Sequence, residues 1–145
     1  MYVPVAAVAF DNAVGDVIDP SNGRIVAGTR LAPNAREFAD GARLVRGGEP
    51  AGLKRSNTTL AVVATNAALS KVEASKLAAF GSLGMARTIS PVNTTSDGDL
   101  TVGLSIGSKS APIDALGVAA AEAVAKSILA AVRAAKTMGG LPGLG

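Results

Sequence analysis

Hydrophobic positions in the second half of the chain predict strands and helices in alternation. Residues 59–65 (TLAVVAT) form an apolar run rich in β-branched side chains, which predicts a buried strand. A helix is expected to begin at Ser70, because Ser70 and Glu73 form a capping-box pattern. This helix is predicted to end at Gly81 or Gly84, and residues 85–96 are interpreted as irregular.

A second strand and a second helix follow. Residues 100–106 (LTVGLSI) predict a strand that is entered through Asp97-Gly98-Asp99. Beyond Pro112 apolar residues recur every three or four positions, as one face of a long helix requires: Ile113, Leu116, Ala120, Val124, Ile128 and Val132. The order strand, helix, strand, helix favours an α/β fold built in layers.

The first 57 residues give weaker patterns. Residues 2–10 predict a strand that is interrupted by Pro4, and D-P-S-N-G predicts a turn before a short return strand at IVAG. Residues 31–54 are rich in Gly, Pro and charge, which indicates a long, exposed and partly helical connection. We therefore expect one domain with an exposed linker at about 31–57.

Composition narrows the chemistry. The chain of 145 residues contains 48% hydrophobic but only 3% aromatic residues, so small aliphatic side chains must fill its core. It has no Cys and no His, which excludes disulfides, thiolate metal sites, cysteine nucleophiles and every Ser-His-Asp triad. Any catalytic base must be a carboxylate, a lysine or an α-amino group. No cofactor and no metal are predicted, since two nearby aspartates fall short of a calcium loop.

Charge and hydropathy give no sign of a nucleic-acid or membrane partner. The net charge of +3 is mild, and no aromatic residues are interleaved with the loose basic group Arg43, Arg46, Lys54 and Arg55. The apolar segment 111–135 contains four charged residues, so we do not expect it to span a membrane. No secretory signal is recognisable, and a cytoplasmic location is expected.

Three short polar motifs are the candidates for function. Asn57-Thr58-Thr59 places two hydroxyls at the mouth of the predicted strand 59–65, either as an ordinary polar entry or as a point of chain cleavage that frees a threonine. Asp97-Gly98-Asp99 suits a turn before a strand, and on the residues alone the turn is favoured over a carboxylate pair beside a nucleophile. Asn12 suits a turn at a strand end in the same way.

Two longer stretches resemble a known family. NTTLAVVATNAALSK and GMARTISPVNTTSDGDLTVGLSIG are similar to the region around the cleavage site of the L-aminopeptidase/D-esterase family. The upstream VAAVAFDNAVGDVIDPSNGRIVAG is similar to the segment before the cut, so the resemblance covers nearly the whole chain. This family includes β-aminopeptidases and endo-type hydrolases of nylon (6-aminohexanoate) oligomers. The Asn-Thr pair and the D-x-D pattern make the nylon-oligomer branch the closer match.

The resemblance implies specific roles. The Asn57–Thr58 bond would be the autocleavage site, and Thr58 would become an N-terminal nucleophile. Residues 1–57 would then be the C-terminal part of the larger-subunit region, and residues 58–145 the smaller-subunit region. Asp97 and Asp99 match the family's acidic pair near the nucleophile, and Asn12 matches an Asn that lines the active site and helps to hold the oxyanion. The implied fold is part of a four-layer αββα sandwich, similar to N-terminal nucleophile hydrolases.

The same resemblance implies partners. Family precursors are longer, so the N-terminal half of the fold, or a separately encoded complement, is expected to pair with this chain. A homo-oligomer and a small peptide or amide substrate are also expected. The function predicted is amide hydrolysis of the aminopeptidase or nylon-oligomer type. The alternatives are a truncated, non-catalytic remnant or structural subunit, and an acyltransferase of the ornithine acetyltransferase type, which also uses a self-released threonine.

Overall fold

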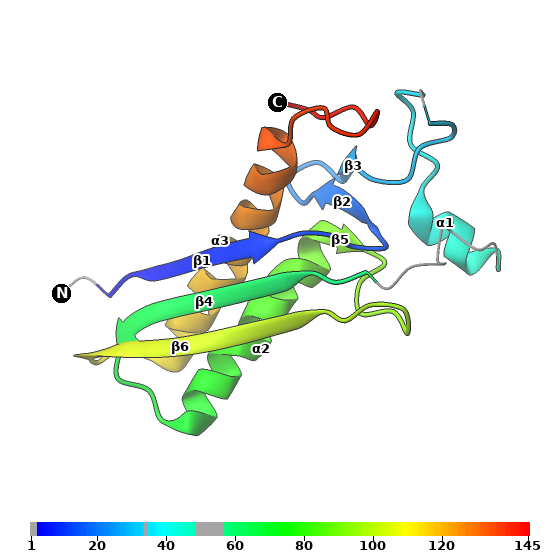
Figure 1. Ribbon diagram of the computed structural model, residues 1–145. Coiled ribbons are helices and arrows are strands. Elements are labelled where there is room, and N and C mark those ends of the chain that lie inside the picture. Colours follow the sequence, from blue (N-terminus) through cyan, green and yellow to red (C-terminus); the bar gives the residue numbers. More distant parts are fainter. Residues whose placement is uncertain (1–2, 34, 49–56) are drawn as a thin grey trace.

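Over residues 3–33, 35–48 and 57–145, the computed structural model contains two three-stranded sheets and three α-helices (Figure 1). The larger sheet has the strand order β1–β4–β6, with β1 at Val5–Phe10, β4 at Leu60–Ala67 and β6 at Leu100–Lys109. Strand β4 is antiparallel to β1 and parallel to β6. A parallel pair needs a crossover connection, and this is helix α2, Lys71–Thr88.

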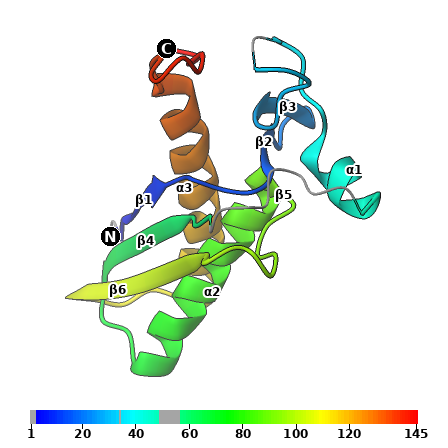
Figure 2. The same ribbon diagram turned by 45° about the vertical axis from the view of Figure 1, so that its right-hand side comes forward.

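Both long helices cover the same face of the larger sheet. Helix α3 (Ile113–Ala134) packs against α2 and crosses behind β1 and β4 (Figures 1 and 2). The order β4, α2, β6, α3 confirms the predicted alternation and the α/β class. The four-layer arrangement stays a prediction, because the described chain forms one large sheet with helices on one side.

The smaller sheet has the order β3–β2–β5 and packs near the ends of both helices. Strands β2 (Asp16–Asp19) and β3 (Arg24–Ala27) form a hairpin across the D-P-S-N-G turn, as predicted. Strand β5 (Ile89–Ser90) lies within the segment that was predicted to be irregular. That prediction was wrong because Ile89 is buried and its main chain pairs with Val17 of β2.

The connection at residues 31–54 is partly helical, as expected. Helix α1 spans Gly41–Arg46, and the Asp40 side chain accepts a hydrogen bond from Arg43 N at 3.0 Å at its start. The connection is tied to the smaller sheet by the buried Asp16, whose carboxylate accepts hydrogen bonds from the N–H groups of Thr29 and Gly41. The rest of the predicted linker, residues 49–56, lies outside the described residues.

Helix α2 begins where the capping box predicts. The Ser70 hydroxyl accepts a hydrogen bond from Glu73 N, and the Glu73 carboxylate accepts one from Ser70 N. The predicted end at Gly81 or Gly84 was wrong, since the helix continues to Thr88. These glycines do not stop the helix, and their role lies in packing.

Glycines let α2 approach its neighbours closely. A Cβ atom on Gly84 would lie 2.4 Å from the carbonyl oxygen of Ala121 in α3. A Cβ on Gly117 of α3 would lie 2.3 Å from a ring carbon of Phe80 in α2. Real Cβ atoms do not approach other atoms so closely, so the two helices can be in contact only because these two residues are glycines, which have no side chain.

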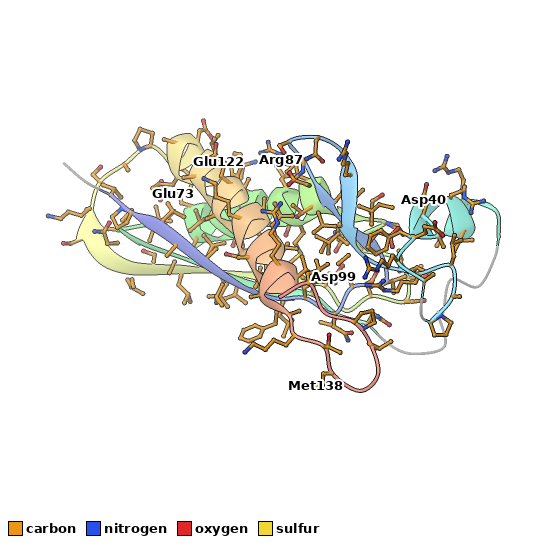
Figure 3. The ribbon with its side chains drawn as sticks, turned by 90° about the horizontal axis from the view of Figure 1, so that it is seen from above. Asp40, Glu73, Arg87, Asp99, Glu122 and Met138 are labelled. Atoms are coloured by element: carbon orange, nitrogen blue, oxygen red, sulfur yellow. The ribbon has the colours of Figure 1, made fainter. Side chains whose placement is uncertain are left out.

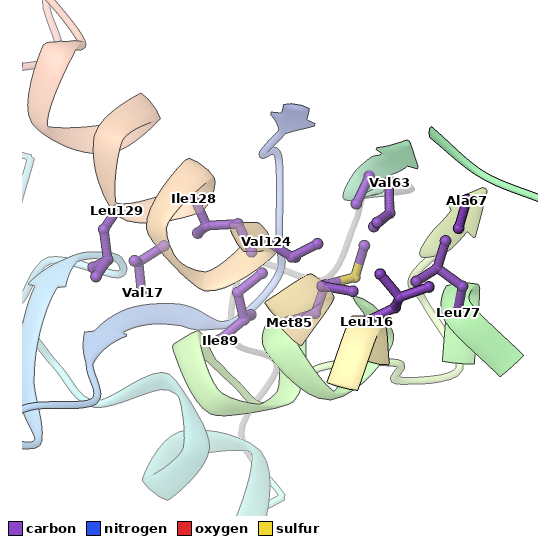
Figure 4. Packing of buried hydrophobic residues seen from close by; sticks show 12 residues of the cluster. Val17, Val63, Ala67, Leu77, Met85, Ile89, Leu116, Val124, Ile128 and Leu129 are labelled. Atoms are coloured by element: carbon purple, nitrogen blue, oxygen red, sulfur yellow. The ribbon is translucent and has the colours of Figure 1, made fainter. Parts of the chain in front are cut away.

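The core between the helices and the sheets is aliphatic, as the composition predicts (Figure 4). Met85 of α2, Val63 of β4 and Ile128 of α3 are almost completely buried in it. Of the predicted face of α3, Leu116, Ala120, Val124 and Ile128 are buried, and Ile113 and Val132 pack at its border. Helix α3 is also long and apolar enough to cross a membrane, with a mean hydropathy of 1.7, but its apolar face is used in this packing.

The opposite face of the larger sheet is also apolar. Within the described residues, large hydrophobic side chains there are between 40% and 72% exposed: Val8, Phe10, Leu60, Leu100, Val102, Leu104 and Ile106. Strand β4 therefore alternates, with Ala61, Val63 and Thr65 buried and Leu60 outside. The predicted strand at 59–65 is therefore confirmed, but only the side chains on its helix-covered face are buried.

We predict that Gly84→Ala destabilises the chain. The added methyl group would collide with the α3 main chain, and overpacking of this kind costs about 1–3 kcal/mol of unfolding free energy, although alanine is the better helix former. Chemical denaturation would measure the change. Gly47→Ala is the control, because its Cβ would meet no atom closer than 3.4 Å. Equal stability of Gly84→Ala and wild type would contradict the packing argument.

Candidate active site

Three segments meet at one edge of the larger sheet. Residues 11–13 follow the end of β1, whereas residues 57–59 precede β4 and residues 97–99 precede β6. The register aligns Phe10 with Leu60 and Leu60 with Leu100, so the end of β1 and the beginnings of β4 and β6 lie side by side. All the residues predicted for the site belong to these three segments.

Residues 57–59 are hydrogen-bonded to residues 97–99 on one side. The Gly98 N–H donates to the carbonyl oxygen of Asn57 at 2.8 Å, and the Thr59 N–H donates to Asp99 Oδ1 at 2.6 Å. An isolated parallel bridge joins Asn57 to Asp97. The parallel pairing of β4 and β6 thus continues past the strands into the polar motifs.

Residues 57–59 are bound by the end of β1 on the other side. The Thr58 N–H donates to the main-chain carbonyl of Asn12 at 3.1 Å, and Asn57 Nδ2 donates to the carbonyl of Ala13 at 3.2 Å. Both polar groups of the peptide bond between Asn57 and Thr58 therefore have partners. Its C=O accepts from Gly98, and its N–H donates to Asn12.

The Thr58 side chain lies against Gly98. A Cβ atom at Gly98 would be 2.7 Å from Thr58 Oγ1, so the hydroxyl occupies space that any other residue at this position would fill. Thr58 is half-buried, whereas the neighbouring Thr59 is completely buried. Of the two hydroxyls, that of Thr58 is the one that a substrate could approach.

Asp97 binds main chain on both sides of the site. Its Oδ2 accepts hydrogen bonds from the N–H and the hydroxyl of Thr94 at 2.9 and 2.7 Å. Its Oδ1 accepts a longer one from Val14 N at 3.4 Å. Asp97 thereby links the turn before β6 to the segment after β1.

Asp99 also bridges two segments. Besides Thr59 N, its carboxylate accepts a hydrogen bond from Asn93 N at 3.0 Å. Along the horizontal direction of Figure 3, Asp99 lies between Glu73 at the start of α2 and Asp40 at the start of α1. Within the described chain, both carboxylates bond to groups other than the Thr58 hydroxyl. Asn12 contributes its main-chain carbonyl, and its side chain is exposed.

Sequence reasoning missed Asp11. Its Oδ1 accepts hydrogen bonds from Thr59 Oγ1 and Ala13 N, both at 3.2 Å. Burial raises the pKa of Asp11 above its usual value, the two hydrogen bonds oppose this shift, and the charge of Asp99 adds to it. The only signal was its position beside Asn12 at the end of a strand.

A cavity of about 550 Å³ lies elsewhere, lined by β3, residues 28–33, the end of α3 and the C-terminal tail. No residue of the three segments contributes to it. The candidate site is therefore defined by the contacts around one peptide bond at the edge of the sheet.

Comparisons with known proteins point to one family. Residues 3–144 match the family model described as peptidase family S58. An uncharacterized aminopeptidase of Mycobacterium tuberculosis and one of Mycobacterium bovis are each 34% identical to the chain over 163 residues, which cover 97% of this chain and 46% of the relative. An uncharacterized aminopeptidase of Mycobacterium leprae is 32% identical over 158 residues, which cover 95% of this chain and 42% of the relative. The chain thus spans less than half the length of these relatives.

The raised pKa of Asp11 predicts a pH-dependent stability. The folded chain binds the Asp11 proton more tightly than the unfolded chain, so this group lowers the free energy of unfolding as pH rises from the usual carboxyl range through the raised pKa. Asp11→Asn should remove that loss, because an amide oxygen can still accept from Thr59 and Ala13. Chemical denaturation at several pH values would measure it.

Asp19→Asn is the control of opposite sign. Hydrogen bonds from Ser21, and then Arg133, lower the pKa of Asp19, so its stabilisation is lost as pH falls. Identical pH profiles for wild type and Asp11→Asn would show that burial does not shift the Asp11 pKa.

Proposed function

The chain belongs to peptidase family S58, the L-aminopeptidase/D-esterase family that its sequence resembles, and we propose that it is an amide hydrolase activated by self-cleavage. Thr58 is the N-terminal nucleophile that cleavage between Asn57 and Thr58 releases. The substrate is a small peptide or another amide, of the aminopeptidase or nylon-oligomer type. The single observation that carries the proposal is the Asn57–Thr58 peptide, held by hydrogen bonds at both its C=O and its N–H beside the accessible Thr58 hydroxyl.

Self-cleavage is the first stage. Thr58 Oγ1 bonds to the carbonyl carbon of Asn57, the bond from that carbon to Thr58 N breaks, and the hydroxyl proton passes to the nitrogen. Water then attacks the resulting ester, its C–Oγ1 bond breaks, and a proton returns to the Thr58 hydroxyl. The Gly98 N–H already points at the carbonyl oxygen that becomes negatively charged.

The freed amine of Thr58 serves as the base in the second stage. A chain without histidine needs another group that is partly neutral near pH 7, and an α-amino group has a reference pKa of about 7.7–8.0. Before cleavage this nitrogen is an amide and cannot accept a proton. The Asn12 carbonyl, which binds the Thr58 N–H, would then orient the amine.

Asp97 and Asp99 orient the nucleophile by holding the main chain on either side of it. Asp99 binds the N–H of Thr59, and Asp97 ties the turn before β6 to Val14. In this proposal the side-chain amide of Asn12 lines the site and, together with a main-chain N–H, donates a hydrogen bond to the oxyanion. A donor of that kind typically contributes roughly 3–4 kcal/mol to lowering the barrier.

The outer face of the larger sheet supports a further part of the proposal. A sheet that is apolar on both faces is typical of an internal layer, and this one exposes Phe10 and Ile106 by 66% and 72%. We propose that the N-terminal half of the family fold, or a separately encoded complement, covers this face and completes a four-layer αββα sandwich. Homo-oligomers would form from such units.

Intact-mass analysis tests the cleavage. The protein should yield a piece that ends at Asn57 and a piece of 88 residues (145 − 57) that begins at Thr58. Thr58→Ala should remain whole, because no hydroxyl is left to attack, whereas Thr58→Ser keeps the hydroxyl and should still cleave. A wild-type chain that stays whole even in the presence of the complementary half would favour the non-catalytic alternative.

We also predict that Gly98→Ala slows self-cleavage by about a hundredfold. The new methyl group would displace the Thr58 hydroxyl, and misplacing a reacting group by about 1 Å has an effect of that size. The time course of the two products, followed by mass spectrometry on freshly made protein, gives the rate. Gly47→Ala should cleave like wild type, and an unchanged rate in Gly98→Ala would contradict the geometry.

A further inference from the structure

We propose that the main chain of residues 96–98, which binds Asn57 before cleavage, afterwards binds the acyl residue of the substrate in the same way. The Gly98 N–H is then the oxyanion donor in both reactions. This inference rests on the proposed function, because it takes Thr58 as the nucleophile of both stages. It adds a binding subsite and a choice of substrate class.

Asn57 is bound like a residue of an added strand. Its N–H donates to the Ser96 carbonyl at 3.3 Å, and its own carbonyl accepts from the Gly98 N–H at 2.8 Å. Its side-chain Nδ2 donates to the Ala13 carbonyl at 3.2 Å. Main-chain pairing of this kind is a general way to bind an extended peptide, with side-chain contacts giving selectivity.

The two reactions pass through the same kind of ester. Self-cleavage leaves the Asn57 acyl group on Thr58 Oγ1. With a substrate, Thr58 Oγ1 bonds to the acyl carbon, the bond from that carbon to the leaving amine breaks, and the hydroxyl proton reaches that amine through the Thr58 nitrogen. In both cases water attacks the ester, the C–Oγ1 bond breaks, and the acid leaves. The substrate's acyl residue therefore takes the place that Asn57 held.

Gly98 brings the donor, the nucleophile and the carbonyl together. A Cβ on this residue would lie 2.7 Å from Thr58 Oγ1 and 3.8 Å from the Asn57 oxygen. The Gly98 N–H therefore reaches an acyl oxygen while the nucleophile lies beside the same residue. The Gly98 main chain lies close to both the nucleophile and the carbonyl oxygen. This closeness leaves no room for a side chain at residue 98, and it also allows the Gly98 N–H to donate to the oxygen.

The Ser96 carbonyl selects the substrate class. An acyl residue with an amino group on the carbon next to the carbonyl places that group where Asn57 N lies, within reach of Ser96 O. A 6-aminohexanoyl group has a methylene there and cannot donate. The geometry thus favours α-aminoacyl amides, and a residue with an amide side chain, such as asparagine, can also donate to the Ala13 carbonyl.

An amide-to-ester replacement tests the oxyanion donor. Glycolic acid in place of Gly98 in the complete protein removes only the N–H, and self-cleavage should slow by about 10²–10³-fold. The same replacement at Gly47 is the matched control, since the Gly47 N–H also donates a main-chain hydrogen bond, to Arg43 O at 3.0 Å. If the Gly98 ester cleaves at the wild-type rate while wild type cuts between Asn57 and Thr58, this inference is overturned and the proposed function stands.

A substrate series tests the subsite without any variant. The cleaved, complete protein is given L-asparaginyl p-nitroanilide, its analogue without the α-amino group, and 6-aminohexanoyl p-nitroanilide. We expect kcat/KM to be lower by about tenfold to hundredfold for the two substrates that lack the donor, as loss of a charged hydrogen bond predicts. Equal kcat/KM values for the asparaginyl compound and its analogue would overturn the subsite. Absence of any cut at Thr58 would instead remove the proposed function itself.

Discussion

The parallel register of β4 and β6 is the constraint on which the candidate site depends. Leu60 aligns with Leu100 across 40 residues of sequence, and the bridge from Asn57 to Asp97 extends the same register. A shift by one residue would turn the buried side of β4 outward, and it would also separate the Gly98 N–H from the Asn57 carbonyl. The register that buries the correct face of β4 is therefore also the register that forms the candidate site.

The crossover helix keeps that register in place through close packing. Helices α2 and α3 pack side by side on one face of the larger sheet, and the absence of side chains at Gly84 and Gly117 allows the two helices to touch. The core around them is filled by small aliphatic residues together with Met85. Few aromatic residues are needed when the main chains approach so closely, because interdigitation of small groups reaches the density of a protein interior.

The edge of the sheet combines rigidity with access. Thr59 is completely buried and held by Asp11 and Asp99, so the chain before β4 has little freedom. Thr58, one residue earlier, stays half-buried beside a glycine. The peptide bond between Asn57 and Thr58 is held in place by hydrogen bonds at both its C=O and its N–H. The Thr58 hydroxyl beside it can therefore attack a carbonyl group whose position is fixed. The same fixed geometry would hold an acyl group in place.

The sequence alone determined the order of strands and helices, the capping box at Ser70, the aliphatic core and, through resemblance, the family. Its local patterns could not show that Gly81 and Gly84 lie inside α2, because a glycine that ends a helix and one that admits a neighbouring helix look alike in a single chain. The residues predicted for the site do come together. Only the tertiary structure decided what each of them touches, including the roles of Asp11 and the Gly98 N–H, because main-chain hydrogen bonds between distant segments leave no pattern in the side chains.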